Sequence, residues 1–182
     1  MHGYLYYKSY MKTFMRGFSG VRILIGLFFL LFGREIEAAT STAPIGVSAT
    51  VIAACALGTS TLAFGAFTPG GSALNANGSL IITCTNGDNY TIALNAGSGS
   101  GATIPIRVLT QPTAPTGKLQ YTIYTTTART TVWGNGTTGS TVAGTGSGVA
   151  QTITVPGTIF AGQGGTATPG NYTDSVTITV TF

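Results

Sequence analysis

The chain has 182 residues, of which 7% are charged, with a formal net charge of +4 at pH 7 and a single histidine. This length suits one domain with a sizeable core. So few ionisable side chains leave little with which to transfer protons, which argues against an enzyme.

The first 39 residues have the pattern of a secretory signal peptide. Four basic residues and no acidic one lie within residues 1–22, and the apolar run ILIGLFFLLFG follows at 23–33. That run is shorter than the about 20 residues of a permanent membrane helix, although an uncleaved anchor is the alternative. We expect cleavage near Ala38 or Ala39, and translation from Met11 would give a signal peptide of more ordinary length.

The rest of the chain predicts β-strands separated by Gly-rich turns such as TNGDN, WGNG and AGQGG. Short runs of alternating apolar and polar residues in one exported domain favour an antiparallel β-sandwich. Pro156 interrupts its run, which predicts an edge strand or a bulge there. The predicted strands are residues 46–53, 61–67, 80–85, 90–94, 104–109, 119–125, 151–160 and 175–182.

Cys55 and Cys84 are the only cysteines, and both follow the predicted signal peptide. In an oxidising compartment such a pair is most simply one disulfide bond. Free thiols and metal ligands are the alternatives, and no histidine remains after residue 39 to complete a metal site.

Five charged side chains remain beyond residue 39, with a net charge of +1: Asp88, Arg107, Lys118, Arg129 and Asp174. The basic character of the whole chain therefore belongs to the signal peptide and gives no support for nucleic acid as a partner. The Gly-rich stretch GTGSGVA precedes β-branched residues and not a helix, so we do not expect it to bind phosphate. The sequence predicts no catalytic residue, no metal site and no cofactor.

The two ends of the mature chain carry the most informative patterns. The last strand places Val176, Ile178, Val180 and Phe182 on one face, and no further strand follows. The segment before Cys55 also alternates, with Ile45, Val47, Ala49 and Val51 on one side. Exposed apolar edge strands template association and are normally suppressed, and this chain has one such segment at each end.

Several sequence segments resemble the spore coat protein U domain family, which includes the subunits of archaic chaperone–usher pili such as the Csu pilus. They are LAFG, ITCT around Cys84, YTIAL, LQYTIY, the ARTTVWGNG turn, and the terminal pattern G-x-Y-x-D-x-V-x-I-x-V-x-F. The resemblance covers essentially the whole mature chain. One departure is the Thr125-Thr126 pair, where relatives commonly have Asp or Asn.

The resemblance implies an all-β fold, an incomplete immunoglobulin-like antiparallel β-sandwich that lacks its final strand and is completed by donor-strand exchange. Residues 40–53 would be the donor segment, and residues 54–182 the pilin domain with its acceptor groove. The implied partners are a periplasmic pilus chaperone, an outer-membrane usher and neighbouring pilin subunits. The protein would be secreted through the periplasm to the cell surface, as a structural pilin for adhesion and biofilm formation.

Two other functions remain open at this stage. A secreted spore or cell coat protein could use the same export machinery. A soluble β-sandwich could instead bind carbohydrate through Trp133, Tyr121 or Tyr124, because an aromatic ring can stack on a sugar face, although such residues more often belong to a core.

Overall fold

A computed structural model describes residues 38–113, 117–165 and 167–182. The predicted signal peptide lies outside the described residues except for its last two positions. The chain divides into two units between Ser48 and Ala49, and the fold below is that of the second unit. Within the described residues, no helix is long and apolar enough to cross a membrane.

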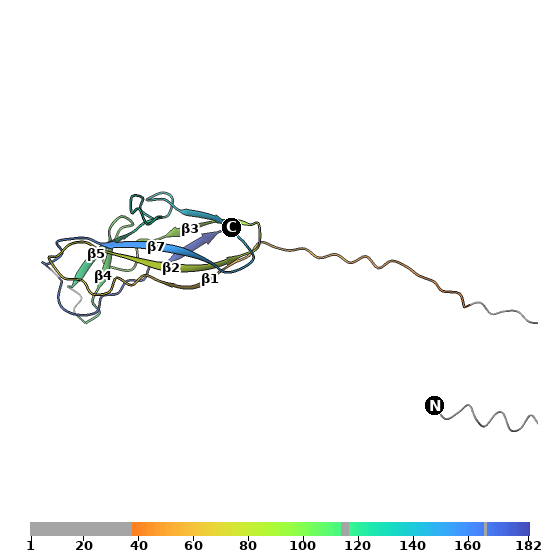
Figure 1. Ribbon diagram of the computed structural model, residues 1–182, viewed down its shortest axis with the longest axis horizontal. Coiled ribbons are helices and arrows are strands. Elements are labelled where there is room, and N and C mark those ends of the chain that lie inside the picture. Colours follow the sequence, from red (N-terminus) through yellow and green to blue (C-terminus); the bar gives the residue numbers. More distant parts are fainter. Residues whose placement is uncertain (1–37, 114–116, 166) are drawn as a thin grey trace, which may run out of the picture. The chain divides into compact units, whose positions relative to one another are not determined.

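The fold consists of β-strands in two antiparallel sheets, as the alternating sequence pattern predicts. The five-stranded sheet has the order β1-β2-β7-β5-β4, and the three-stranded sheet has the order β6-β3-β8. Figure 1 shows the long β2 and β7 side by side, and their pairing runs from Leu74 opposite Ile159 to Ile82 opposite Gln151. The strands are β1 (Cys55–Thr61), β2 (Leu74–Cys84), β3 (Asn89–Leu94), β4 (Arg107–Thr110), β5 (Lys118–Ile123), β6 (Val142–Thr145), β7 (Gln151–Ile159) and β8 (Ile178–Thr181).

The core lies between the inward faces of the two sheets. Alternate residues of β2 and β3 point into it, so that Leu80, Ile82 and Ile92 are almost completely buried. Trp133, in the turn after β5, is fully buried and donates a 2.9 Å hydrogen bond from Nε1 to the Ile92 carbonyl. Burial of an aliphatic side chain such as Leu80, Ile82 or Ile92 stabilises the folded state by roughly 1.5–3 kcal/mol.

The structure corrects the strand prediction at several places: β2 begins earlier than predicted, at Leu74, and β4 and β8 begin later, at Arg107 and Ile178. Residues 46–53 and 62–67 have no strand structure, and the first strand is Cys55–Thr61. β6 was not expected, because VAGT lacks apolar alternation and lies among Gly-rich turn residues.

Pro156 lies in β7, which has neighbours on both sides, so the expected edge strand or bulge is wrong. The proline is accommodated because the pairing of β5 with β7 covers only Tyr121–Ile123 and ends opposite Gly157. One residue further, the Pro156 carbonyl accepts a 2.8 Å hydrogen bond from the Tyr124 amide. β7 therefore needs no amide donor at Pro156.

Candidate functional site

The first and last strands are both edge strands, and the sandwich is open between them. β1 is the terminal strand of the five-stranded sheet, and β8 is the terminal strand of the three-stranded sheet. β8 pairs on one side only, with β3, from Leu94 opposite Ile178 to Thr91 opposite Thr181. Within the described residues, the other edge of β8 faces no strand.

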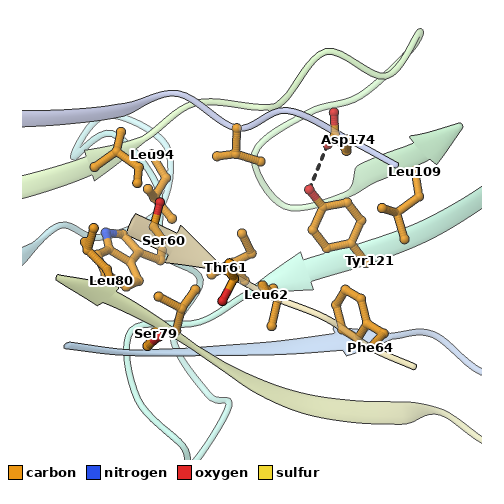
Figure 2. Close-up of a pocket in the computed structure, with 15 residues that line it drawn as sticks. Ser60, Thr61, Leu62, Phe64, Ser79, Leu80, Leu94, Leu109, Tyr121 and Asp174 are labelled. Carbon is orange, nitrogen blue, oxygen red and sulfur yellow. Dashed lines mark hydrogen bonds between the residues drawn. The ribbon is translucent and has the colours of Figure 1, made fainter. Parts of the chain in front are cut away.

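A cavity of about 180 Å³ opens into the core between these two edges (Figure 2). One wall comes from the end of β1 and the residues after it, and the other from the segment that leads into β8. Core residues form the floor, including Leu80 and Trp133. The residues of the two walls are Ser60, Thr61, Leu62 and Phe64 on the first side and Asp174, Val176 and Ile178 on the second.

A second hollow, of about 900 Å³, continues the opening toward the far end of the sandwich. It shares Leu62, Phe64 and Leu109 with the first cavity, so the two form one groove. Its walls are again the residues after β1, from Leu62 to Pro69, and the residues before β8, from Ala167 to Tyr172. None of the described residues that line this second hollow is charged.

Two glycines let the first wall approach the sheet closely. A Cβ atom at Gly78 would collide with the Thr61 carbonyl, and one at Gly157 would lie 2.7 Å from Leu62 Cδ2 and 2.9 Å from Phe64 Cζ. The segment after β1 can therefore leave the sheet and cross β7. Phe64 then packs edge-on against Tyr121 at 5.7 Å between ring centroids.

The second wall is fixed by Asp174. Its Oδ1 accepts hydrogen bonds from the Ser98 amide at 2.8 Å, the Ser98 hydroxyl at 2.9 Å and the Ser175 amide at 2.7 Å. Its Oδ2 accepts the Tyr121 hydroxyl at 2.7 Å, as the dashed line in Figure 2 shows. Thr173 and Thr110 exchange two backbone hydrogen bonds of 2.9 Å beside it. These contacts hold the segment before β8 in place, and its half-buried Val176 lines the cavity.

Arg107 lies beneath this polar cluster and is completely buried. Its guanidinium donates to the carbonyls of Asn95 at 3.0 Å, Ile104 at 3.0 Å and Trp133 at 2.8 Å. Burial lowers the pKa of Arg107, and the nearby Tyr121 and Asp174 oppose that shift. The pKa of Tyr121 is raised above its ordinary value by burial first and then by its hydrogen bond to Asp174. The cluster supports the groove.

The predicted acceptor residues fall in two places. Val176 and Ile178 line the first cavity, and together with Val180 they pack half-buried against the core. Phe182 is 55% exposed and lines a separate hollow beside Tyr90 and Gly144.

The predicted donor residues are exposed. Ile45, Val47 and Val51 are 87%, 90% and 83% exposed, and Ala49 is exposed as well. The segment has no regular secondary structure.

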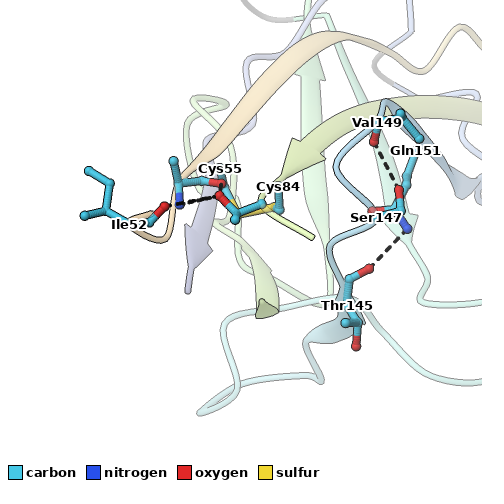
Figure 3. The surroundings of a disulfide bond; sticks show 9 residues. Ile52, Cys55, Cys84, Thr145, Ser147, Val149 and Gln151 are labelled. Carbon is cyan, nitrogen blue, oxygen red and sulfur yellow. Dashed lines mark hydrogen bonds between the residues drawn. A yellow bond between two sulfur atoms is a disulfide. The ribbon is translucent and has the colours of Figure 1, made fainter. Parts of the chain in front are cut away.

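The predicted disulfide between Cys55 and Cys84 is present, with an S–S length of 2.07 Å. It fixes the start of β1 to the end of β2 (Figure 3). Thr85 adds to this connection, because its amide donates 2.9 Å to the Ala54 carbonyl and its hydroxyl accepts from the Ala54 amide at 3.1 Å. The edge strand β1 is thereby held close to the point where the predicted donor segment ends.

The carbohydrate-binding hypothesis fails for two of its three aromatic residues. Trp133 is 0% exposed and Tyr121 is 3% exposed. Both belong to the core, so neither ring can stack on a sugar.

Sequence reasoning missed the first wall and the polar cluster of the second. The sequence predicts a strand over residues 61–67, which include LAFG, and it predicts no structural role for Asp174. The G-x-Y-x-D pattern was a signal for Asp174, but its partners Tyr121 and Ser98 lie 53 and 76 positions away.

Comparison with known proteins supports the fold. The family model described as Spore Coat Protein U domain matches residues 41–179. A relative called Protein U, from Myxococcus xanthus, is 36% identical over 160 residues, which cover 80% of this chain and 87% of the relative.

Solved structures are similar at lower identity. A chain in the CsuC–CsuE chaperone–tip adhesion subunit pre-assembly complex, from the archaic chaperone–usher Csu pili of Acinetobacter baumannii, aligns with a TM-score of 0.52 and 22% identity. The match covers 73% of this chain and 40% of that one, so this chain spans less than half the length of its structural neighbour. The likeness places the sandwich among the immunoglobulin-like folds of chaperone–usher pilus components.

Proposed function

The chain belongs to the Spore Coat Protein U domain family, and we propose that it is a structural pilin of an archaic chaperone–usher fibre. In this proposal, its groove between β1 and β8 receives the N-terminal segment of another copy. The groove first binds a strand of a periplasmic chaperone, and the exchange takes place at an outer-membrane usher. The assembled fibre serves adhesion and biofilm formation at the cell surface.

The observation that carries the proposal is the open groove between the first and last strands. Its floor includes the core residues Trp133 and Leu80, which supports the addition of an element at this place. An extended strand suits this place, because the free edge of β8 offers backbone hydrogen bonds and the cavity accepts alternate side chains.

The donor segment matches the acceptor segment in length and pattern. Ile45 to Val51 and Val176 to Phe182 each place four residues on one face over six residue steps, or about 20 Å of extended chain. A copy whose donor segment enters another copy leaves its own groove free for the next. Such head-to-tail contacts do not close and therefore build a filament.

Charge substitutions on the two segments test the proposal in cells that contain the chaperone and usher. Val180→Asp places an unpaired charge on the acceptor face and should abolish both chaperone capture and fibre assembly. Thr179→Asp is the matched control, because Thr179 is exposed on the opposite face of β8. The double variant Val47→Asp/Val51→Asp should still co-purify with the chaperone but form no fibres.

Co-purification measures chaperone capture, and electron microscopy counts the fibres. Normal fibres from Val47→Asp/Val51→Asp would show that residues 45–51 are not the donor. Equal effects of Val180→Asp and Thr179→Asp would show that the inward face of β8 is not the acceptor.

A second candidate function is a secreted spore or cell coat protein. The 36% identity to Protein U of Myxococcus xanthus favours it. A coat protein would be recovered from spores or the cell envelope as a layer, whereas a pilin would be recovered as fibres sheared from the cell surface. Immunogold labelling of intact cells and spores distinguishes the two.

A further inference from the structure

We infer that the disulfide end of the sandwich is a second contact surface, which packs against the copy that receives the donor segment. This inference rests on the proposed function. We define the disulfide end by four chain segments that meet there, residues 52–55, 84–89, 145–151 and the terminal Phe182. The strand register places them together, since Cys55 pairs with Cys84, Asn89 with Thr145, and Thr91 with Thr181.

The disulfide end exposes apolar side chains that the domain does not cover. Ile52 is 75% exposed, Val149 is 65% exposed and Phe182 is 55% exposed. Both loops that carry the first two residues are anchored to β2 and its following turn. The Ile52 carbonyl lies 3.4 Å from the Thr85 hydroxyl, and the Gly148 amide donates 3.0 Å to the Cys84 carbonyl. Ile52 and Val149 therefore flank the disulfide on a supported backbone (Figure 3).

The continuity of the chain indicates which molecule the disulfide end would contact. Ile52 directly follows Val51, the last of the four residues on the predicted donor face, and two residues, Ala53 and Ala54, separate it from Cys55. At about 3.3 Å per residue, the disulfide end lies within roughly 15 Å of the groove that holds Val51. The receiving copy must therefore come close to this end. The covalent connection to the donor segment thus identifies the partner of the disulfide end, which its exposed apolar side chains alone would not do.

The second hollow is the surface of the receiving copy that best fits this contact. Antiparallel pairing is the more stable arrangement per residue and is the one found for every strand pair in this sandwich. A donor antiparallel to β8 that places Ile45 opposite Phe182 places Val51 opposite Val176. The chain from Ile52 onward then leads toward the hollow of about 900 Å³, whose lining includes Phe67, Pro69 and Tyr172.

Charge is compatible with this contact. Apart from the bonded cysteines, Asp88 is the only ionisable side chain in the segments that form the disulfide end, and the described residues that line the second hollow carry no charge. Burying these two surfaces together therefore removes mainly apolar and neutral polar groups from water. The donor strand would set the register, and this contact would slow dissociation and limit the angle between neighbouring copies.

Photocrosslinking in fibres assembled with chaperone and usher tests the inference. A benzoylphenylalanine at position 149 should give covalent dimers, and the captured peptide should come from residues 62–69 or 167–172 of the neighbouring copy. The same probe at position 106 is the control, because Ile106 is 42% exposed but lies beside β4, away from the disulfide end. A probe at position 47 reports the donor contact itself.

The outcomes separate the inference from the proposed function. Dimers from position 47 but none from position 149, or a position 149 link to other residues, would overturn the inference and leave the pilin proposal standing. No dimers from position 47 would overturn both.

Dissociation kinetics give a second readout. Val149→Ser should speed fibre dissociation in denaturant by about tenfold, the equivalent of losing one buried Val side chain, and Ile106→Ser should leave the rate unchanged. Equal rates for Val149→Ser and wild type would count against the contact.

Discussion

The Tyr121 hydroxyl donates a 2.7 Å hydrogen bond to Asp174 Oδ2 and so connects the two sheets at the floor of the groove. Tyr121 belongs to β5 of the five-stranded sheet, and Asp174 lies in the segment that leads into β8 of the three-stranded sheet. The bond holds the segment before β8 beside the groove. The groove can therefore be organised before a strand enters it.

Tyr121→Phe should lower the free energy of unfolding by about 1.5–3 kcal/mol, the usual contribution of a hydrogen bond to a charged group. The measurement is urea unfolding of the domain with a donor segment fused after Phe182. An unchanged midpoint would show that the bond does not support the second wall.

The pH dependence of the same protein provides an independent test of Tyr121. Because the folded state raises the pKa of Tyr121, its contribution to stability is fully present below pH ~10, the pKa of an unfolded tyrosine, and is lost as the pH rises above that value. The unfolding free energy of the wild type should fall more steeply above pH ~10 than that of Tyr121→Phe. Parallel curves would contradict the assigned environment.

Gly157→Ala should displace the first wall, because the added Cβ would lie 2.7 Å from Leu62 Cδ2 and 2.9 Å from Phe64 Cζ. Overpacking of this kind costs about 1–3 kcal/mol, and the donor-fused domain should unfold at correspondingly lower urea. Gly165→Ala is the matched control, since its added Cβ would have no atom within 4 Å. Equal midpoints for the two variants would show that Gly157 is not needed for the crossing.

Replacing both cysteines, as Cys55→Ser/Cys84→Ser, should destabilise the donor-fused domain by about 3–4 kcal/mol, the chain-entropy estimate for a closed loop of this size. The residues are 29 positions apart. Urea unfolding of the variant, compared with the oxidised and reduced wild type, measures the effect. A variant as stable as the oxidised protein would show that other contacts suffice to hold β1.

The sequence predicted those features that depend on local pattern. Alternation placed Val176, Ile178 and Val180 on one face of the last strand, and export together with the cysteine count predicted the disulfide. The pattern could not show that Leu62 and Phe64 would leave the sheet, because an alternating LAFGAF segment is equally typical of a strand. It also could not bring Asp174 to Tyr121, since that contact depends on the stacking of the two sheets.

The most direct test of the missing strand is the solution behaviour of the mature subunit with and without a tethered donor. A copy of residues 44–53, fused after Phe182 through a short flexible linker, should fill the groove within the same molecule. The account predicts a soluble, stable monomer for the fusion, and instability or self-association for the unfused subunit without chaperone, both measured by light scattering and urea unfolding. An unfused subunit that remains a stable monomer at high concentration would contradict the account, because its domain would then be complete without a donor strand.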